Sequence, residues 1–196
     1  MTKKLGILVL AIGAVAALLA IAAVSWRGRP ASVTPDLGGP FALIDANNGE
    51  TVTERSFEGK LMVIYFGYTF CPDACPTTLN NVSQALAKLG ADADRIAPLF
   101  ISVDPERDTP QVMARYVKAF DPRIRGLTGD AETTLRVAKE FGVYYRKHDV
   151  PGGYLIDHSS LLYIMDGKGA LLRVLPASES GDRLAGDLRR LLGSKS

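Results

Sequence analysis

A continuous apolar run that leads directly into two cysteines constrains the fold of this chain most. Residues 61–68, LMVIYFGY, carry no charge and are rich in β-branched and aromatic side chains. Such a run is typical of a strand that is buried on both faces of a sheet. A second run of this kind, APLFISV, covers residues 97–103. Together they predict the centre of a sheet in an α/β domain.

The remaining patterns place helices and hairpins around these strands. Asn48-Gly49 within residues 41–52 indicates a β-hairpin, and a turn at Gly167-Lys168-Gly169 indicates a second one over residues 160–175. Helical periodicity follows the cysteines, and further helices are expected after Thr109-Pro110, over residues 131–141 and over residues 182–192. The order of elements predicts an α/β sandwich with a central mixed sheet and an N-terminal β-hairpin.

The two cysteines of the chain, Cys71 and Cys75, lie where the first buried strand gives way to a helix. Proline suits the first helical position, so Pro76 predicts that Cys75 caps the helix and that Cys71 lies in the preceding loop. Both thiols then face the positive end of the helix dipole, which favours the thiolate. The C-x-x-x-C spacing alone leaves open a dithiol/disulfide couple and a metal clamp. An incidental structural disulfide is disfavoured, because domains stapled by disulfides carry more cysteines, spread more widely.

The surroundings of the two histidines differ. His148 lies among charged residues in YYRKHDV, so we expect a solvated side chain. His158 lies at the entry to an expected buried strand, which can neighbour the strand that ends at the cysteines. Two thiolates and one imidazole suit copper or zinc, and three ligands favour a transferable ion over a structural zinc. Asp73 and Asp157 are candidates for weak axial or outer groups, but solvated loop acids would give the same pattern.

The N-terminal segment is apolar enough to enter a membrane. Residues 5–24 form an uncharged run that would reach about 30 Å as a helix, the thickness of a bilayer core. Lys3 and Lys4 precede it, so we expect the N-terminus to stay inside. The alternative is a signal peptide cleaved after Ala20-Ile21-Ala22, but the run is longer than a usual signal core. We therefore expect an anchor over residues 1–26, a Pro- and Gly-rich linker over 27–39 and one domain over 40–196.

The charge distribution excludes a nucleic-acid-binding protein. Four of the 23 Lys and Arg residues precede Pro30, so 19 basic residues remain beside 21 acidic ones. This near-neutral part has no basic block of the kind that phosphate contacts require.

Three stretches in one order make the sequence resemble the Sco/SenC family of copper-binding assembly proteins. They are YFGYTFCPDACPTTL (65–79), SVDPERDTP (102–110) and YLIDHSSLLYIMD (154–166), and the resemblance spans roughly residues 40–192. It implies a thioredoxin-like fold behind a transmembrane helix. It also implies that Cys71, Cys75 and His158 bind one copper ion, as Cu(I) or Cu(II).

The resemblance further implies a copper chaperone that assists assembly of the CuA site of cytochrome c oxidase. The expected partners are the copper-accepting oxidase subunit and another periplasmic copper chaperone or thiol reductase. No Arg- and Ser-rich presequence precedes the apolar run, which argues against an organelle transit peptide, so we expect the bacterial inner membrane, with the domain facing the periplasm or extracytoplasmic side.

Two other functions compete with copper transfer, which needs no turnover of a substrate. The main alternative is a membrane-anchored thiol-disulfide oxidoreductase that reduces the cysteines of a copper-accepting partner. A peroxiredoxin-like peroxidase is disfavoured, because Tyr68 stands where that group has Thr or Ser before its reactive cysteine. Asp104, Arg107 and Asp108 are expected to form a structural loop with a helix cap, rather than the rim of the site.

Overall fold

A computed structural model of the chain describes residues 37–193. The expected membrane anchor over residues 1–26 and most of the expected linker lie outside the described residues. Within residues 37–193, no helix combines the length and the apolar character that crossing a membrane requires.

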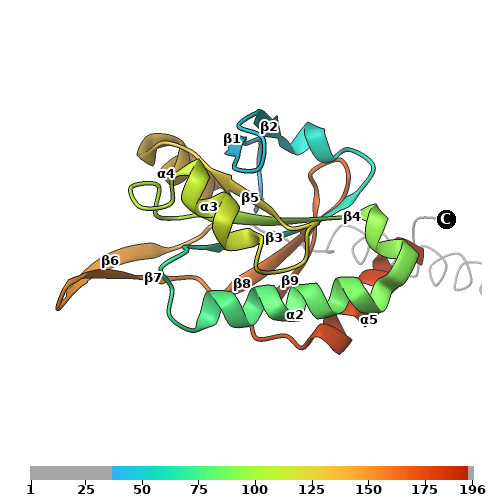
Figure 1. Cartoon of the computed structure of the whole chain (residues 1–196). Helices are drawn as coiled ribbons and strands as arrows, with labels where there is room; N and C mark the ends of the chain where they lie inside the picture. Colours follow the sequence, from blue (N-terminus) through green and yellow to red (C-terminus); the bar gives the residue numbers. More distant parts are fainter. Residues whose placement is uncertain (1–36, 194–196) are drawn as a thin grey trace, which may run out of the picture. The chain divides into compact units, whose positions relative to one another are not determined.

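The described residues are built on a mixed seven-stranded sheet with the order β2-β1-β5-β4-β3-β8-β9. β3, β4 and β5 are parallel, whereas β1 and β8 run antiparallel to their neighbours. The strands are β1 (Ala42–Asp45), β2 (Thr51–Thr53), β3 (Leu61–Gly67), β4 (Ile96–Ser102), β5 (Arg125–Thr128), β8 (Leu161–Met165) and β9 (Leu171–Pro176). A separate hairpin of β6 (Tyr145–Val150) and β7 (Gly153–His158) pairs only with itself and projects from the domain (Figure 1).

Helices pack on both faces of the sheet. They are α2 (Ala74–Leu89), α3 (Pro110–Val117), α4 (Ala131–Glu140) and α5 (Gly181–Gly193), with short 3-10 helices η1 (Glu54–Phe57) and η2 (Gly90–Arg95). α2 and α5 lie side by side (Figure 1). Tyr65 of β3 stacks on Phe100 of β4, which contacts Tyr116 of α3. The next residue, Phe66, points to the opposite face and meets Phe141 at the end of α4.

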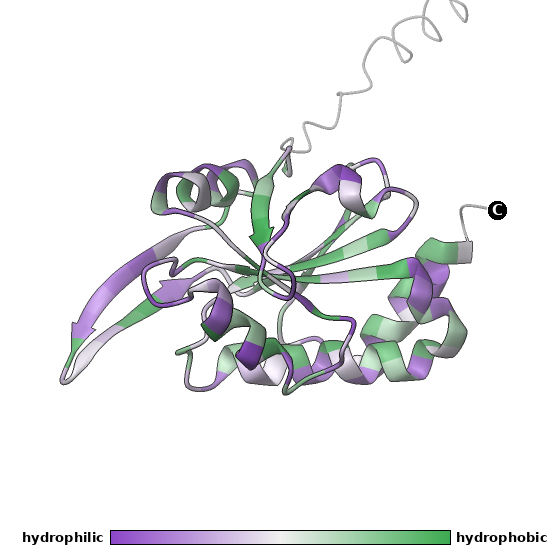
Figure 2. Cartoon of the chain, turned by 45° about the horizontal axis from the view of Figure 1, so that its top comes forward, coloured by the Kyte–Doolittle hydropathy of each residue, from purple (hydrophilic) through white to green (hydrophobic). Residues whose placement is uncertain are grey.

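The core is centred on β3 and β4, in which every residue is buried. Figure 2 shows these strands as the apolar centre of the domain. Burial of a large apolar side chain contributes roughly 1.5–3 kcal/mol, so this pair of strands provides a rigid base. The loop that carries Cys71 and leads to Cys75 begins at the end of β3, so it is anchored directly to this rigid base.

The predicted fold class is confirmed: the domain has a central mixed sheet with an N-terminal β-hairpin, here β1 and β2. The two apolar runs are β3 and β4, and β8 with β9 form the second predicted hairpin. β5 and the hairpin of β6 and β7 were not predicted from the sequence. His158 was placed at the entry to a buried strand, but it is the last residue of β7, and β8 begins three residues later.

Candidate metal centre

The expected helix start was wrong by two residues. Cys75 was predicted to cap the helix, but α2 begins at Ala74 and Asp73 occupies the N-cap position. Cys75 is therefore within the first turn, and Pro76 is the third helical residue. The first N–H groups of a helix have no partner within it, so a proline there removes no hydrogen bond. Pro76 is therefore compatible with the first turn of α2, in which Cys75 is one of the buried residues.

The two sulfurs differ in depth. Cys75 is completely buried, and the hydroxyl of Tyr65 donates toward its Sγ over 3.7 Å. Cys71 is only half-buried, in the loop between β3 and α2, and its Sγ accepts from the backbone N–H of Cys75 at 3.4 Å. Gly67 makes the depth of Cys75 possible, because a Cβ at Gly67 would lie 2.7 Å from that Sγ.

The loop before Cys71 is fastened by a buried carboxylate. Asp108 is fully buried and accepts from the backbone N–H and the hydroxyl of Thr69, at 3.1 and 2.6 Å. The hydroxyl of Ser102, at the end of β4, donates to the same carboxylate at 2.7 Å. Burial raises the pKa of Asp108, against the lowering effect of these hydrogen bonds. Thr109 caps α3 through its side chain, as the predicted helix cap requires.

His158 completes the group from the other side. Its Nε2 lies 3.6 Å from the Sγ of Cys75, and its Nδ1 lies 3.2 Å from the carbonyl oxygen of Ser159. When Nδ1–H donates to that carbonyl, Nε2 presents its lone pair to the sulfurs, which is the tautomer that a metal ligand needs. The rings of Tyr65 and Tyr68 pack edge-on against the imidazole at 6.0 and 5.9 Å.

The structure thus brings Cys71, Cys75 and His158 together, as the sequence predicted. Their ligand atoms all lie within 4.8 Å of one another, and within residues 37–193 this is the one such group of three or more His, Cys, Asp or Glu side chains. Bonds of about 2.0–2.3 Å to nitrogen and sulfur would span such separations with small adjustments. Asp73 and Asp157 are exposed and do not belong to the group.

Asp157, which lies outside the group of three, is close to the other histidine instead. Its carboxylate lies 3.4 Å from Nδ1 of His148, which is on β6 and 39% exposed. His148 is outside the group of three, as expected.

The pair of thiols holds one proton and one negative charge. Hydrogen bonding from the Cys75 thiol lowers the pKa of Cys71 to about 3, and hydrogen bonds from the backbone add to this effect. The same bond to Cys71, together with burial, raises the pKa of Cys75 above its ordinary value. Cys71 is therefore the thiolate and Cys75 the thiol. A partly exposed thiolate beside a helix N-terminus can attack a disulfide or capture a soft metal ion.

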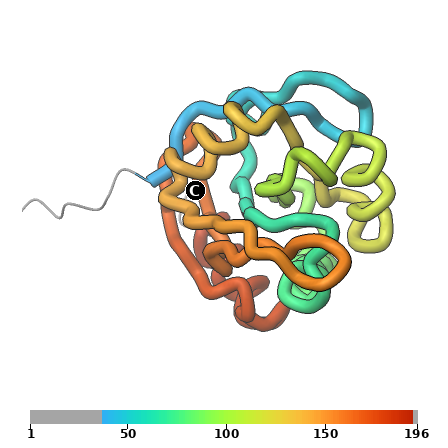
Figure 3. Tube along the Cα trace, turned by 90° about the vertical axis from the view of Figure 1, so that its left-hand side faces the viewer, coloured from blue at the N-terminus to red at the C-terminus, as the bar shows by residue number. Residues whose placement is uncertain are grey.

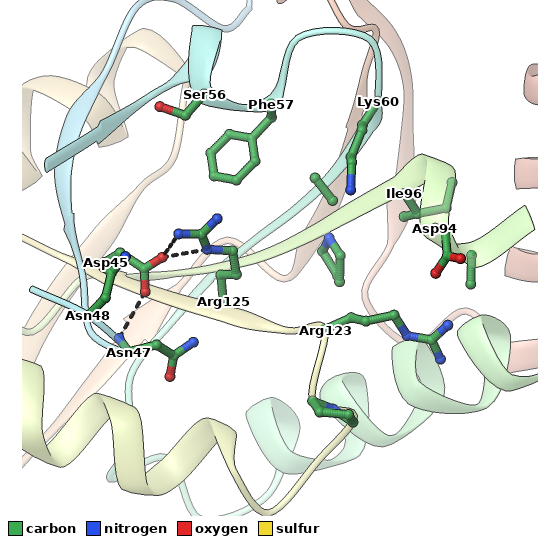
Figure 4. A pocket seen from close by; sticks show the side chains of 14 residues that line it. Asp45, Asn47, Asn48, Ser56, Phe57, Lys60, Asp94, Ile96, Arg123 and Arg125 are labelled. Carbon is green, nitrogen blue, oxygen red and sulfur yellow. Dashed lines mark hydrogen bonds and ion pairs between the residues drawn. The ribbon is translucent and has the colours of Figure 1, made fainter. Parts of the chain in front are cut away.

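A polar cavity of about 390 Å³ lies away from this group (Figure 4). The cavity lies at the beginnings of the three parallel strands, which are marked by Lys60, Ile96 and Arg125. The cysteines, in contrast, follow the end of β3. Arg125 forms an ion pair there with the buried carboxylate of Asp45. No cysteine or histidine lines the cavity, so it takes no part in the candidate metal centre.

The sheet, its helices and the three converging side chains define a thioredoxin-like domain with a compact, sulfur-rich site for one metal ion. Comparison with known proteins gives the family. The SCO1/SenC family model matches residues 29–193, and this chain belongs to that family.

Its relatives include solved structures of high similarity. ScoI of Bradyrhizobium japonicum, solved with copper bound, is 44% identical with a TM-score of 0.74, covering 79% of this chain and 98% of that one. Arabidopsis thaliana ScoI, also solved with copper bound, is 39% identical with a TM-score of 0.75, covering 80% and 99%. Protein sco1 of Schizosaccharomyces pombe is 41% identical over 82% of this chain, which spans 61% of that relative's length.

Proposed function

We propose that this protein is a copper chaperone that carries one copper ion on Cys71, Cys75 and His158. The observation that supports this most is the meeting of two sulfurs and an imidazole nitrogen within 4.8 Å. Thiolates favour Cu(I), and the imidazole helps to retain Cu(II). Family members from a bacterium and a plant have been solved with copper bound.

The recipient of the ion follows from the family. The Sco family is described as one of cytochrome c oxidase assembly proteins, and we propose that the partner of this chain is the copper-accepting oxidase subunit, with its CuA site as the destination of the ion. The apolar run over residues 5–24 supports an anchor in the bacterial inner membrane, with the domain in the periplasm. In this arrangement residues 27–39 link the anchor to the domain. Copper is the cargo, and the chain need not turn over a substrate.

A histidine exchange tests the ligand assignment. The full chain in detergent, loaded with Cu(II), should hold one equivalent and show an intense sulfur-to-copper charge-transfer band. His158→Ala should weaken Cu(II) binding sharply and alter the band. His148→Ala is the matched control, because that ring lies outside the group of three, and it should change neither property. Equal affinity of the wild type and the His158→Ala variant would contradict the assignment.

One observation also supports thiol-disulfide exchange as a second function. Cys71 is a partly exposed thiolate, and the Cys75 thiol beside it can form the disulfide that releases a reduced partner. The two sulfurs together would supply the two electrons that reduce the partner's disulfide. Reduction of an oxidised CuA domain should then persist in His158→Ala and vanish in Cys75→Ser. Loss of this reduction in both variants would exclude it as an activity separate from copper binding.

A further inference from the structure

The hairpin that carries His158 has no backbone pairing with the main sheet. β6 and β7 form a sheet of their own, and His158 is the last residue of β7. Figure 3 views the domain from the side on which this hairpin projects. Cys71 and Cys75, in contrast, follow directly from the buried strand β3. Apart from the short chain link from His158 into β8, the position of the imidazole relative to the sulfurs therefore depends on the side chains that fasten the hairpin to the body.

One of these fastenings is made by Arg107, in the loop after β4, beside the burial of Ile156 in the core. Its Nε donates to the carboxylate of Asp104 at 2.5 Å, and its Nη1 donates to the backbone oxygen of Tyr154 on β7 at 2.9 Å. The guanidinium also stacks on the ring of Tyr154, with its central carbon 3.6 Å from the ring centroid. Asp104 is completely buried and accepts from the hydroxyl of Tyr154 at 2.8 Å. Arg107, Asp104 and Tyr154 thus form a closed triangle, here called the hairpin latch.

Two further contacts fasten the hairpin. The backbone N–H of Ile156 donates to the hydroxyl of Tyr68 at 3.2 Å, two residues before His158. Lys147 of β6 pairs with Glu106 at 2.6 Å, but this pair is largely exposed and adds little. Arg107 differs from both, because one planar group bonds a buried carboxylate, bonds the β7 backbone and stacks on a β7 side chain. Lysine cannot reproduce that combination.

We propose that Arg107 is a positioning residue for the metal centre: through the hairpin latch it holds β7 so that His158 reaches the two sulfurs. This inference rests on the proposed function, in which His158 is a ligand. It goes beyond the sequence-based expectation that Asp104, Arg107 and Asp108 form a structural loop with a helix cap. When the latch is broken, a smaller fraction of molecules holds the imidazole in place, and the apparent Cu(II) affinity falls by the same factor. Residues that orient metal ligands typically change affinity by about 10-fold to 100-fold.

The test is a double-mutant cycle on the full chain in detergent. The substitution is Arg107→Lys, which keeps a positive charge beside buried Asp104 and so favours a folded product. The matched control is Arg123→Lys, because Arg123 also binds a nearly buried carboxylate, that of Asp121, but lies beside the cavity of Figure 4. Each substitution is made in the wild type and in the His158→Ala variant. Cu(II) affinity, thermal unfolding and the nitrogen couplings in the Cu(II) electron paramagnetic resonance spectrum are measured.

The proposal predicts that Arg107→Lys weakens Cu(II) binding about 10-fold or more in the wild type and weakens the imidazole nitrogen coupling. In the His158→Ala variant it should have no further effect, because its action passes through His158. Arg123→Lys should leave Cu(II) affinity unchanged in both backgrounds. A purely structural Arg107 would lower the unfolding temperature without changing affinity or nitrogen coupling, and that result overturns the proposal. An equal loss in both backgrounds also overturns it. If His158→Ala itself left affinity unchanged, the ligand assignment would fail instead.

Discussion

The single proton shared by the two thiols predicts how copper affinity depends on pH. Cys71 has a pKa of about 3, whereas the pKa of Cys75 is raised, so near neutral pH the metal-free site holds one thiolate and one thiol. Copper binding needs both sulfurs deprotonated and therefore releases one proton, that of Cys75. Acidification favours the protonated, metal-free protein, so affinity falls as the pH is lowered.

The magnitude follows from counting protons. Release of one proton changes affinity about tenfold per pH unit, or about 1.4 kcal/mol. Two ordinary thiols with a pKa of about 8.5 would both be protonated near pH 7, and affinity would then change about a hundredfold per unit. The slope of log affinity against pH therefore distinguishes a shared proton from two independent thiols.

Competition with a chromophoric Cu(I) chelator measures this slope. The titration is made without oxygen between about pH 7 and 8, above the ordinary range of histidine titration, and corrected for the chelator's own protons. The expected slope is one. In Cys75→Ser the serine hydroxyl takes the place of the Cys75 thiol as the donor that keeps Cys71 a thiolate, so binding should be weaker and its slope near zero. A slope of two in the wild type would refute the assignment of the thiolate to Cys71.

Two further substitutions test how the fold supports the site. Gly67→Ala would place a methyl group 2.7 Å from the Sγ of Cys75 and should lower the free energy of unfolding by about 1–3 kcal/mol, with a loss of copper affinity. The control Gly186→Ala, in α5, meets its nearest atom at 3.9 Å and should not destabilise the fold. Arg125→Ala leaves the fully buried Asp45 without its ion-pair partner. It should lower the free energy of unfolding, measured by chemical denaturation, by about 3 kcal/mol. Its copper affinity should stay unchanged, and a parallel loss would contradict the separation of the cavity from the metal centre.

The parts of the fold that the sequence predicted are those encoded by local patterns. Long apolar runs identified β3 and β4, and glycine-containing turns identified the hairpins at both ends of the domain. The four residues of β5 are too few to show a period, and β6 reads YRKHDV, whose charges suit an exposed hairpin but give no apolar signal. Nothing in the sequence around Pro76 indicated that α2 would begin two residues before it.

The same distinction holds for the site. The ligand candidates were predicted because cysteine and histidine are common metal ligands, and because the family resemblance implied that these three residues bind one ion together. Asp104, Arg107 and Asp108 were predicted only as a structural loop with a helix cap, and their distant partners were not predicted. Asp108 bonds Thr69 across 39 positions, and Arg107 bonds Tyr154 across 47. Such contacts arise only when the sheet brings distant loops together, and arginine or aspartate in a loop looks like an ordinary solvated residue.

The unequal depth of the two sulfurs sets an order for ion transfer. A ligand offered by an approaching protein meets Cys71 first, because Cys75 is completely covered by the first turn of α2 and the end of β3. In the proposed copper transfer, the bond to the exposed sulfur would exchange first and the bond to the buried sulfur last. An ion handed over in this order would stay attached to one of the two proteins throughout.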